Sequence, residues 1–326
     1  DRNLKPAMAQ QWSLNVQQDL KVGVLQVGYV GNHVTHLLTD GVVSPRNVNR
    51  ADIDFFGFNL RRLPQFGDIF VVGSYPSSNY HAMQVTFKRN YANGLHYNFN
   101  YTWSHTIDDV VGFFKDYQNE FDNRGERASS DQDIRHNFVV DASYDLPFNK
   151  IWSNGSKRLI NGWQISTVTQ IRSALPVNVT NQGGVFGGFS FRPNIVPGVS
   201  TRCPAYRVPE CQYNAAAFSN PGVNVPGNVP RNYLRGQSFA QSDISLSKST
   251  GITENTSLVL RIDVFNFLNM VNFADPSGGL TPGATPNSLV PTAFFGRSVT
   301  TVGNQLGGLL GFGGPRQIQL SARFNF

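Results

Sequence analysis

Apolar and polar side chains alternate strictly over the last ten residues of the chain. One face of the extended segment carries Ile318, Leu320, Ala322, Phe324 and Phe326, and the other carries Gln317, Gln319, Ser321, Arg323 and Asn325. A period of two places successive side chains on opposite faces of a β-strand. The same period recurs in residues 95–107 and 256–268. A chain built from such segments forms sheets that have one apolar and one polar face.

Nine segments with this period are predicted as strands: 9–20, 22–33, 80–91, 95–107, 136–146, 160–171, 240–249, 256–268 and 316–326. Helix is disfavoured because the chain is rich in Gly (31) and Pro (18), which are poor in helix interiors and common in turns. The predicted connections alternate between short turns and long loops. Asn93-Gly94 is a strong hairpin signal at one of the short turns.

The alternation of connection lengths favours an antiparallel up-and-down transmembrane β-barrel over a sandwich. Every long loop leaves one side of such a sheet and every short turn the other, as in outer-membrane barrels. Ten residues at ~3.3 Å each, tilted by ~45°, rise about 23 Å, close to the ~25 Å apolar band of these barrels. The mean hydropathy of −0.26 fits a wall with only one apolar face. A soluble β-sandwich is a less favoured alternative.

Nine strands in an antiparallel meander leave the first and last strands pointing the same way. These two strands therefore cannot pair antiparallel to close the sheet, and bacterial barrels normally have an even number of strands. The parity predicts further strands before residue 1, so that residues 1–326 form only a portion of a barrel.

Several stretches, in this order and spacing, resemble one family: Gln10-Gln11-Trp12-Ser13-Leu14, Val27-Gly28-Tyr29-Val30-Gly31, Ser78-Asn79-Tyr80-His81-Ala82-Met83-Gln84-Val85, Asn93-Gly94-Leu95, Tyr101-Thr102-Trp103-Ser104-His105-Thr106-Ile107-Asp108-Asp109, Asp133-Ile134-Arg135-His136-Asn137-Phe138, Gly162-Trp163-Gln164-Ile165, Tyr233-Leu234-Arg235-Gly236, Val264-Phe265-Asn266-Phe267-Leu268-Asn269 and the last strand. The chain is similar to the C-terminal part of the barrel of TonB-dependent outer-membrane receptors. The resemblance is to the Oar-like group, which carries an N-terminal carboxypeptidase-regulatory-like domain.

The resemblance implies a location in the bacterial outer membrane and a role in the uptake of an unidentified extracellular substrate. It implies contact with membrane lipid, with the barrel-assembly machinery and, through a plug domain that residues 1–326 do not contain, with the TonB system. We expect this chain to supply membrane wall, lumen lining and extracellular loops, and to be no enzyme. A surface-exposed structural or adhesion β-protein without transport is the alternative.

Two sets of strand residues are candidates for functional roles. The resemblance implies that the aromatic end of the last strand, Phe324 and Phe326, is the signal read by the assembly machinery. Charged residues on the polar strand faces need water or partners, which a lumen or a plug surface provides. The lumen-lining candidates are Lys88, Arg261, Asp263 and Arg323.

Two loop features have alternative readings. Cys203 and Cys211 bracket seven residues, and we expect a loop disulfide, with a free pair as the alternative. The segment 108–133 holds eight acidic residues (Asp108, Asp109, Asp116, Glu120, Asp122, Glu126, Asp131 and Asp133) against three basic ones. Such a cluster suits Ca²⁺, but it lacks EF-hand spacing, so a solvated loop is favoured.

Other chemistry finds little support in the sequence. His33 and His36 are the one close histidine pair, and a spacing of three on a strand puts them on opposite faces, so we expect no metal site. The Gly-rich stretches 183–188 and 307–314 do not stand between a strand and a helix, as nucleotide binding requires, and are interpreted as loops. No catalytic motif, cofactor site or nucleic-acid-binding motif is found.

Overall fold

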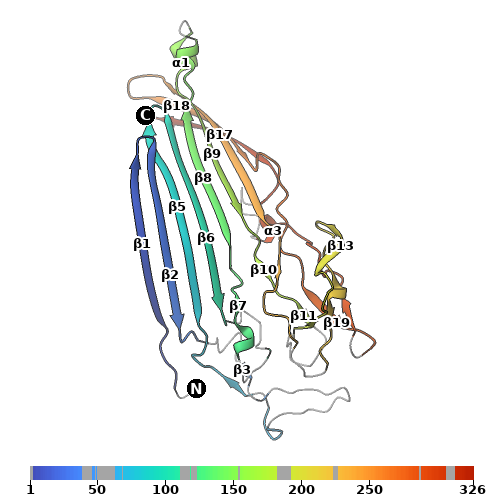
Figure 1. Cartoon of the computed structure of the whole chain (residues 1–326). Coiled ribbons are helices and arrows are strands. Elements are labelled where there is room, and N and C mark those ends of the chain that lie inside the picture. The colour runs from blue at the N-terminus through green and yellow to red at the C-terminus, as the bar shows by residue number, and fades with distance from the viewer. Residues whose placement is uncertain are drawn as a thin grey trace.

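A curved sheet of long antiparallel strands dominates the computed structural model of the chain (Figure 1). The structure describes residues 3–38, 46–47, 49, 63–67, 69–110, 118, 123–152, 155–181, 192–222, 227–285, 288–305 and 313–326. Nine strands follow one another across this sheet: β1 (Met8–Leu20), β2 (Gly23–Thr35), β5 (Ser78–Ala92), β6 (Leu95–Asp108), β8 (His136–Asp145), β9 (Trp163–Arg172), β17 (Phe239–Gly251), β18 (Ser257–Phe265) and β21 (Gln317–Asn325). These are the nine predicted strands, which the structure confirms.

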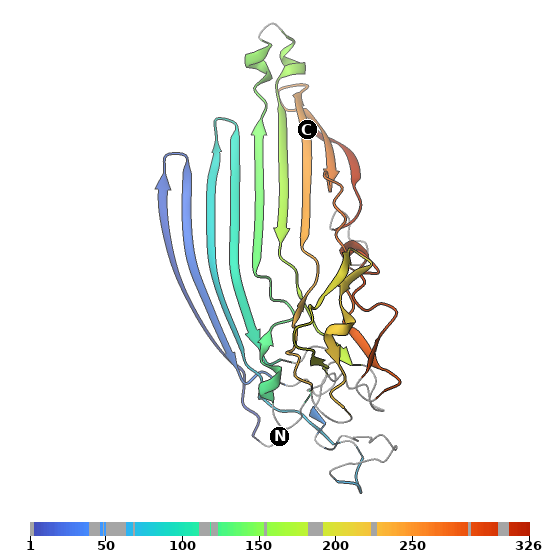
Figure 2. The ribbon, with the colours of Figure 1, turned by 45° about the vertical axis from the view of Figure 1, so that its right-hand side comes forward.

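Each long strand pairs with its neighbours along the chain, so the sheet is a meander. The connections at one end, here called the short-turn end, are residues 21–22, 93–94, 146–162 and 252–256. The long connections all leave the opposite, long-loop end. The sheet is an open arc (Figure 2), and β1 and β21 form its two edges within the described residues.

The register places most of the large apolar side chains of the nine strands on a single face, with exceptions such as Val168 and Val259 on the other. One row across the sheet joins Leu14, Tyr29, Met83 and Trp103, and another row at the far edge joins Leu246, Ile262 and Leu320. Leu14, Leu260 and Leu320 are 68%, 48% and 73% exposed. An apolar face of this size that is open to its surroundings marks a surface that meets lipid or another protein.

Two predicted strand boundaries are wrong by three residues. The strand expected to reach residue 268 ends at Phe265, and the next residue, Asn266, has a positive φ of 48°. The strand expected from residue 160 begins at Trp163, because Lys157–Ile160 form helix α2 and Gly162 turns the chain with a φ of +76°. A side chain at Gly162 would also meet the backbone, because an added Cβ would lie 2.2 Å from the carbonyl oxygen of Ser249. Glycine is the residue that tolerates both conditions.

The long loops contain short elements that the sequence pattern did not predict. The small strands form pairs or triplets outside the main sheet or at its edge: β3 (Arg46–Asn47) with β4 (Phe70–Val71), β7 (Ala128–Ser129) with β6, β10 (Pro176–Val177) with β16 (Leu234–Arg235), β11 (Thr180–Asn181) with β19 (Gly279–Pro282) and β20 (Leu289–Pro291), β12 (Asn194–Ile195) with β15 (Phe218–Ser219), and β13 (Arg202–Arg207) with β14 (Cys211–Tyr213).

The helices are all short. They are α1 (Phe148–Ile151), α2 (Lys157–Ile160), α3 (Val302–Gln305) and the 3₁₀ helices η1 (Asn123–Glu126) and η2 (Ala215–Ala217). Among the described residues, no helix has the length and apolar character that a membrane crossing requires.

The buried core lies among the long loops and not between the faces of the sheet. Its members are Val177, Val179, Tyr213, Ala217, Phe218, Val229, Leu234, Leu280 and Phe295. They come from two of the long connections, 173–238 and 266–316, so apolar burial joins loops that are distant in sequence. The loops at this end therefore form a packed body.

Candidate functional site

The face of the sheet opposite the apolar one is polar, and it carries all four lumen-lining candidates. Lys88 lies opposite Asn98, Arg261 opposite Ser321, Asp263 opposite Gln319, and Arg323 opposite Val259. Arg261, Asp263 and Arg323 come from the adjacent strands β18 and β21, whereas Lys88 lies on β5, which four strands separate from β18. The structure thus brings three of the four candidates together and leaves Lys88 apart from them.

Arg261 and Asp263 form an ion pair at 2.7 Å beside a depression of about 210 Å³. The Arg261 side chain is 52% exposed, so the pair adds less than about 1 kcal/mol to stability. Asp243 also lines the depression and accepts hydrogen bonds from Gln241 Nε2 and from the backbone N–H of Asn266. This wall offers charge and hydrogen bonds to a polar surface.

A buried ion pair joins two of the long loops at the opposite end of the fold. Arg192 donates to both carboxylate oxygens of Glu126, at 2.7 and 3.1 Å, and the two side chains are 5% and 2% exposed. Arg192 also donates to the carbonyl oxygens of Val229 and Gly125. Gln118 completes the contact by accepting from the Arg192 backbone N–H and by donating its own backbone N–H to Glu126.

Arg231 makes a second link between the same loops. It is 3% exposed and donates to the carboxylate and the carbonyl oxygen of Asp108, at the end of β6, and to the carbonyl oxygen of Glu126. The next residue, Asn232, has a positive φ of 57° and donates to Asp131 at 2.6 Å. The loop that leaves β6 is therefore fixed to the loop that enters β17.

Asp133 is the centre of a third contact. Its carboxylate is fully buried and accepts from Arg235 and Arg135, each at 2.7 Å, from His105 and from the backbone N–H of Thr106. Burial alone would raise the pKa of Asp133, but the hydrogen bonds from these four donors favour the ionised form more strongly. The pKa of the carboxyl group is consequently held well below its ordinary value.

The two cysteines are joined in a disulfide. Cys203 lies in β13 and Cys211 in β14, and their Cα atoms are 5.9 Å apart. The pair closes a small hairpin beside Tyr213, which belongs to the loop core. Burial, with the nearby acidic groups of Asp275 and Tyr206, raises the pKa of the Tyr213 phenol, so this hydroxyl stays protonated and donates to the carbonyl oxygen of Arg235.

A comparison of nearly the whole sequence with known families identifies the class of β-protein to which this sheet belongs. The sequence model of the family described as "outer membrane beta barrel domain" matches residues 1–319. The chain belongs to this family. It is therefore an all-β protein of the bacterial outer membrane, and its apolar sheet face is the surface that meets lipid.

Solved structures with a similar arrangement are much longer than this chain. The outer membrane transporter YddB from Escherichia coli is 11% identical with a TM-score of 0.49, and the alignment covers 100% of this chain and 33% of that one. FpvA of P. aeruginosa, solved in an iron complex with a pyoverdine, is 12% identical with a TM-score of 0.43, and the alignment covers 99% of this chain and 28% of that one. No curated protein matches the sequence. The chain thus spans about a third of the first structure, and these values are too low to transfer a ligand to it.

Membership of the outer-membrane barrel family orients the sheet. In these barrels the short turns face the periplasm and the long loops face the outside. The ion pairs of Arg192, Arg231 and Asp133 accordingly lie on the extracellular side. Phe324 and Phe326 lie at the periplasmic end of β21, where their rings are 6.3 Å apart, and their role as an assembly signal remains a prediction.

The acidic segment 108–133 differs from the solvated loop that was expected. Asp108, Glu126 and Asp133 are buried and paired with arginines, because burial of a carboxylate requires a compensating charge. Among the described residues, no group of three or more metal-ligating side chains is placed to hold a metal ion. Asp116, Glu120 and Asp122 lie outside those residues, so Ca²⁺ binding by them is untested.

Two further predictions from the sequence concern the histidine pair and the glycine-rich stretches. His33 hydrogen bonds to Asn79 at 2.6 Å and His36, with a φ of +58°, lies next to Thr35, so each has a partner other than a metal. The stretch 183–188 and most of 307–314 lie outside the described residues.

The partners of the acidic residues were missed by the sequence reasoning. Arg192 and Arg231 lie 66 and 123 residues from the carboxylates that they bind. No period or motif in the loops marks such pairs. The one local signal is the low number of charges in the chain, 15% of residues, which makes a cluster of acids in one loop unusual.

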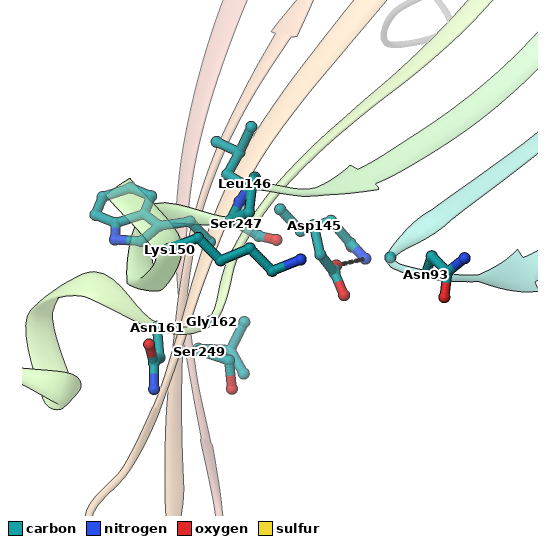
Figure 3. A pocket seen from close by; sticks show the side chains of 13 residues that line it. Asn93, Asp145, Leu146, Lys150, Asn161, Gly162, Ser247 and Ser249 are labelled. Atoms are coloured by element: carbon teal, nitrogen blue, oxygen red, sulfur yellow. Dashed lines mark hydrogen bonds between the residues drawn. The ribbon is translucent and has the colours of Figure 1, made fainter. Parts of the chain in front are cut away.

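A cleft of about 520 Å³ lies at the periplasmic rim, between the turns that follow β5 and β8 and the adjoining ends of β17 and β18 (Figure 3). Asp145 accepts from Gln164 there at 3.0 Å, and the Lys150 side chain extends toward Asp145. The cleft is polar and open, and its lining contains no histidine or cysteine. Such a cleft is better suited to contact with a polar surface than to catalysis.

Proposed function

We propose that this chain is the C-terminal portion of the barrel of a TonB-dependent receptor of the Oar-like group. In this role residues 1–326 supply membrane wall, lumen lining and extracellular loops for the uptake of an unidentified substrate, and they have no catalytic task. The family stretches on β1, β6 and β18, such as Tyr101-Thr102-Trp103-Ser104, support the subgroup.

The observation that carries this proposal is the pair of free sheet edges. In the described part of the chain, the outer edges of β1 and β21 have no partner strand, and the two strands point the same way. In hydrocarbon, each unsatisfied backbone group costs several kcal/mol, so both edges need partners. An antiparallel barrel then requires an odd number of additional strands, which makes it larger than nine.

The gentle curvature of the nine strands (Figure 2) also favours a large barrel. Barrels of 22 strands enclose a plugged lumen, the architecture of outer-membrane transporters, whereas barrels of about 8 strands are filled by their own side chains. The polar wall with Lys88, Arg261, Asp263 and Arg323 supplies the charged surface that a plug would contact.

The test uses the native polypeptide that carries this chain, purified from outer membranes. A photo-crosslinking residue at Ser321, on the polar face opposite Arg261, is expected to capture an upstream part of the same polypeptide. The matched position Leu320, on the apolar face and 73% exposed, is expected to capture none. A second measurement is binding of the periplasmic domain of TonB. A polypeptide that gives neither result would act as an adhesion or structural protein and not as a receptor.

A further inference from the structure

The turn between β8 and β9 differs in charge from the other short turns. Residues 146–162, here called the basic turn, contain Lys150, Lys157 and Arg158 and no Asp or Glu. The turn between β17 and β18, by contrast, carries Glu254 and no cation between residues 252 and 256. The basic turn also includes helices α1 and α2, which extend beyond the neighbouring hairpins (Figure 2).

Hydrogen bonds fix the second half of the basic turn against the lipid-facing side of the sheet. Trp163 and Lys248 lie opposite each other, two residues along their strands from the pair Ile165 and Leu246, so by the strand period they belong to the apolar face. The indole N–H of Trp163 donates to the carbonyl oxygen of Leu159 at 2.8 Å.

Lys248 makes the corresponding contact from β17. Its ammonium donates to the carbonyl oxygens of Arg158, at 2.9 Å, and of Asn161. The turn thus covers Lys248, a cation on the apolar face at this rim. Residues 158–161 consequently lie on the membrane side of the barrel wall and not over the lumen.

Apolar side chains of the basic turn are exposed at the same place. Ile151, Trp152 and Leu159 are 63%, 57% and 71% exposed. Phe148 packs against both Trp152 and Trp163, with ring centroids 5.3 and 6.2 Å apart. Aromatic residues of this kind sit at the headgroup level of a membrane. Lys157 and Arg158, in the same half of the turn as Leu159, are also exposed.

We propose that the basic turn binds anionic phospholipid headgroups of the inner leaflet of the outer membrane. Leu159, Ile151 and Trp152 enter the boundary between headgroups and acyl chains, and Lys157 and Arg158 lie at the phosphates, whereas Lys150 points toward Asp145 in the cleft. This is the combination of apolar burial and electrostatic attraction that holds interfacial segments on anionic membranes. The proposal rests on the orientation of the barrel and is independent of transport.

The location of the turn is tested with the native polypeptide in nanodiscs of phosphatidylcholine, alone or with added phosphatidylglycerol. An environment-sensitive fluorophore on L159C is expected to report an apolar surrounding and to be quenched by lipids that carry a quencher on the acyl chain. The same fluorophore on T253C, in the turn that carries Glu254, is expected to report water. A label on L159C that reports water in both nanodiscs, or that is shielded only when periplasmic proteins are added, overturns the proposal.

The lipid charge is tested by titrating phosphatidylglycerol onto the detergent-solubilised protein and counting the bound lipids by native mass spectrometry. A cation near an anionic surface adds about 1 kcal/mol, or roughly fivefold in affinity. The double variant K157Q/R158Q is therefore expected to bind the first lipid about 25-fold more weakly. The matched control R202Q/R207Q removes two exposed cations at the extracellular end and is expected to leave this affinity unchanged.

Equal affinity of the two double variants overturns the proposal. Lys157 and Arg158 are exposed, and the hydrogen bonds that position the turn use backbone carbonyl groups and not these two side chains, so the barrel is expected to fold in both. Retention of the heat-resistant, compact form on an electrophoresis gel checks this. High salt is expected to weaken lipid binding in the parent protein and to have little further effect in K157Q/R158Q.

Discussion

Replacing Arg192 by methionine is expected to weaken the contact between the loop that follows β6 and the loop that precedes β17, which Arg231 and Arg235 still join. The substitution removes two hydrogen bonds to Glu126 and two to backbone carbonyl groups, and it leaves a carboxylate that is 2% exposed without its partner. Breaking a buried ion pair in this way costs about 3–5 kcal/mol. That cost corresponds to a loss of about two to three and a half orders of magnitude in the protection of nearby amides against hydrogen exchange.

Hydrogen exchange followed by mass spectrometry measures this effect locally. The amide of Val229, which donates to the carbonyl oxygen of Pro193, is expected to lose protection, while the amides of β6 keep theirs. Arg207→Met is the matched control, because Arg207 is 78% exposed and its contact with Glu210 at 3.5 Å contributes little. The reasoning is refuted if the two variants lose similar protection.

A double variant separates the cost of a stranded charge from the value of the pair. Glu126→Leu combined with Arg192→Met removes both charges and is expected to recover part of the protection lost by Arg192→Met alone. If the double variant instead loses as much amide protection as the two single variants combined, lost packing and not the unpaired buried charge accounts for most of the cost.

Three further outcomes follow from the structure. Gly162→Ala places a Cβ at a φ of +76° and 2.2 Å from the carbonyl oxygen of Ser249, and it is expected to lower the free energy of unfolding in urea by about 1–3 kcal/mol. Gly251→Ala is the control, because no atom lies within 4 Å of its added Cβ, and it is expected to change that free energy by no more than about 0.5 kcal/mol. Folding lowers the pKa of Asp133, so the ionised carboxylate stabilises the folded state fully at a pH above its unfolded pKa of about 4. This stabilisation is lost as the pH falls from there through the lower pKa of the folded state. Protease resistance of the loops should fall over this acidic range, and Asp133→Asn should remove that dependence. Reducing the disulfide of loop 203–211 is expected to destabilise its hairpin by about 2–3 kcal/mol, measured as faster proteolysis of that loop alone.

The sheet could be predicted from the sequence because its determinants are local. The alternation of Ile318 to Phe326 requires only that one face meets lipid and the other water, and the tight turn at Asn93-Gly94 fixes the pairing of β5 and β6. Lys88, Arg261, Asp263 and Arg323 were placed on the polar face by the same period. That they line a lumen remains a prediction.

The loop body could not be predicted because its determinants are distant in sequence. Whether Glu126 is solvated or buried depends on Arg192, and the burial of the Asp133 carboxylate depends on Arg235, 102 residues away. A single sequence shows the acids and the arginines but not their pairing. The basic turn was missed for a related reason, because the position of residues 158–161 depends on Lys248 in β17.

The packing of the long loops at the extracellular end limits how this chain can contribute to binding. Loops that capture a ligand by closing over it must lose conformational freedom, and this ordering weakens binding. Two of the described extracellular loops share a core, and the contacts of Arg192, Arg231 and Asp133 join one of them to the loop that follows β6. A molecule that approaches from outside therefore meets a preformed surface here, whose shape and charge exist before any contact is made.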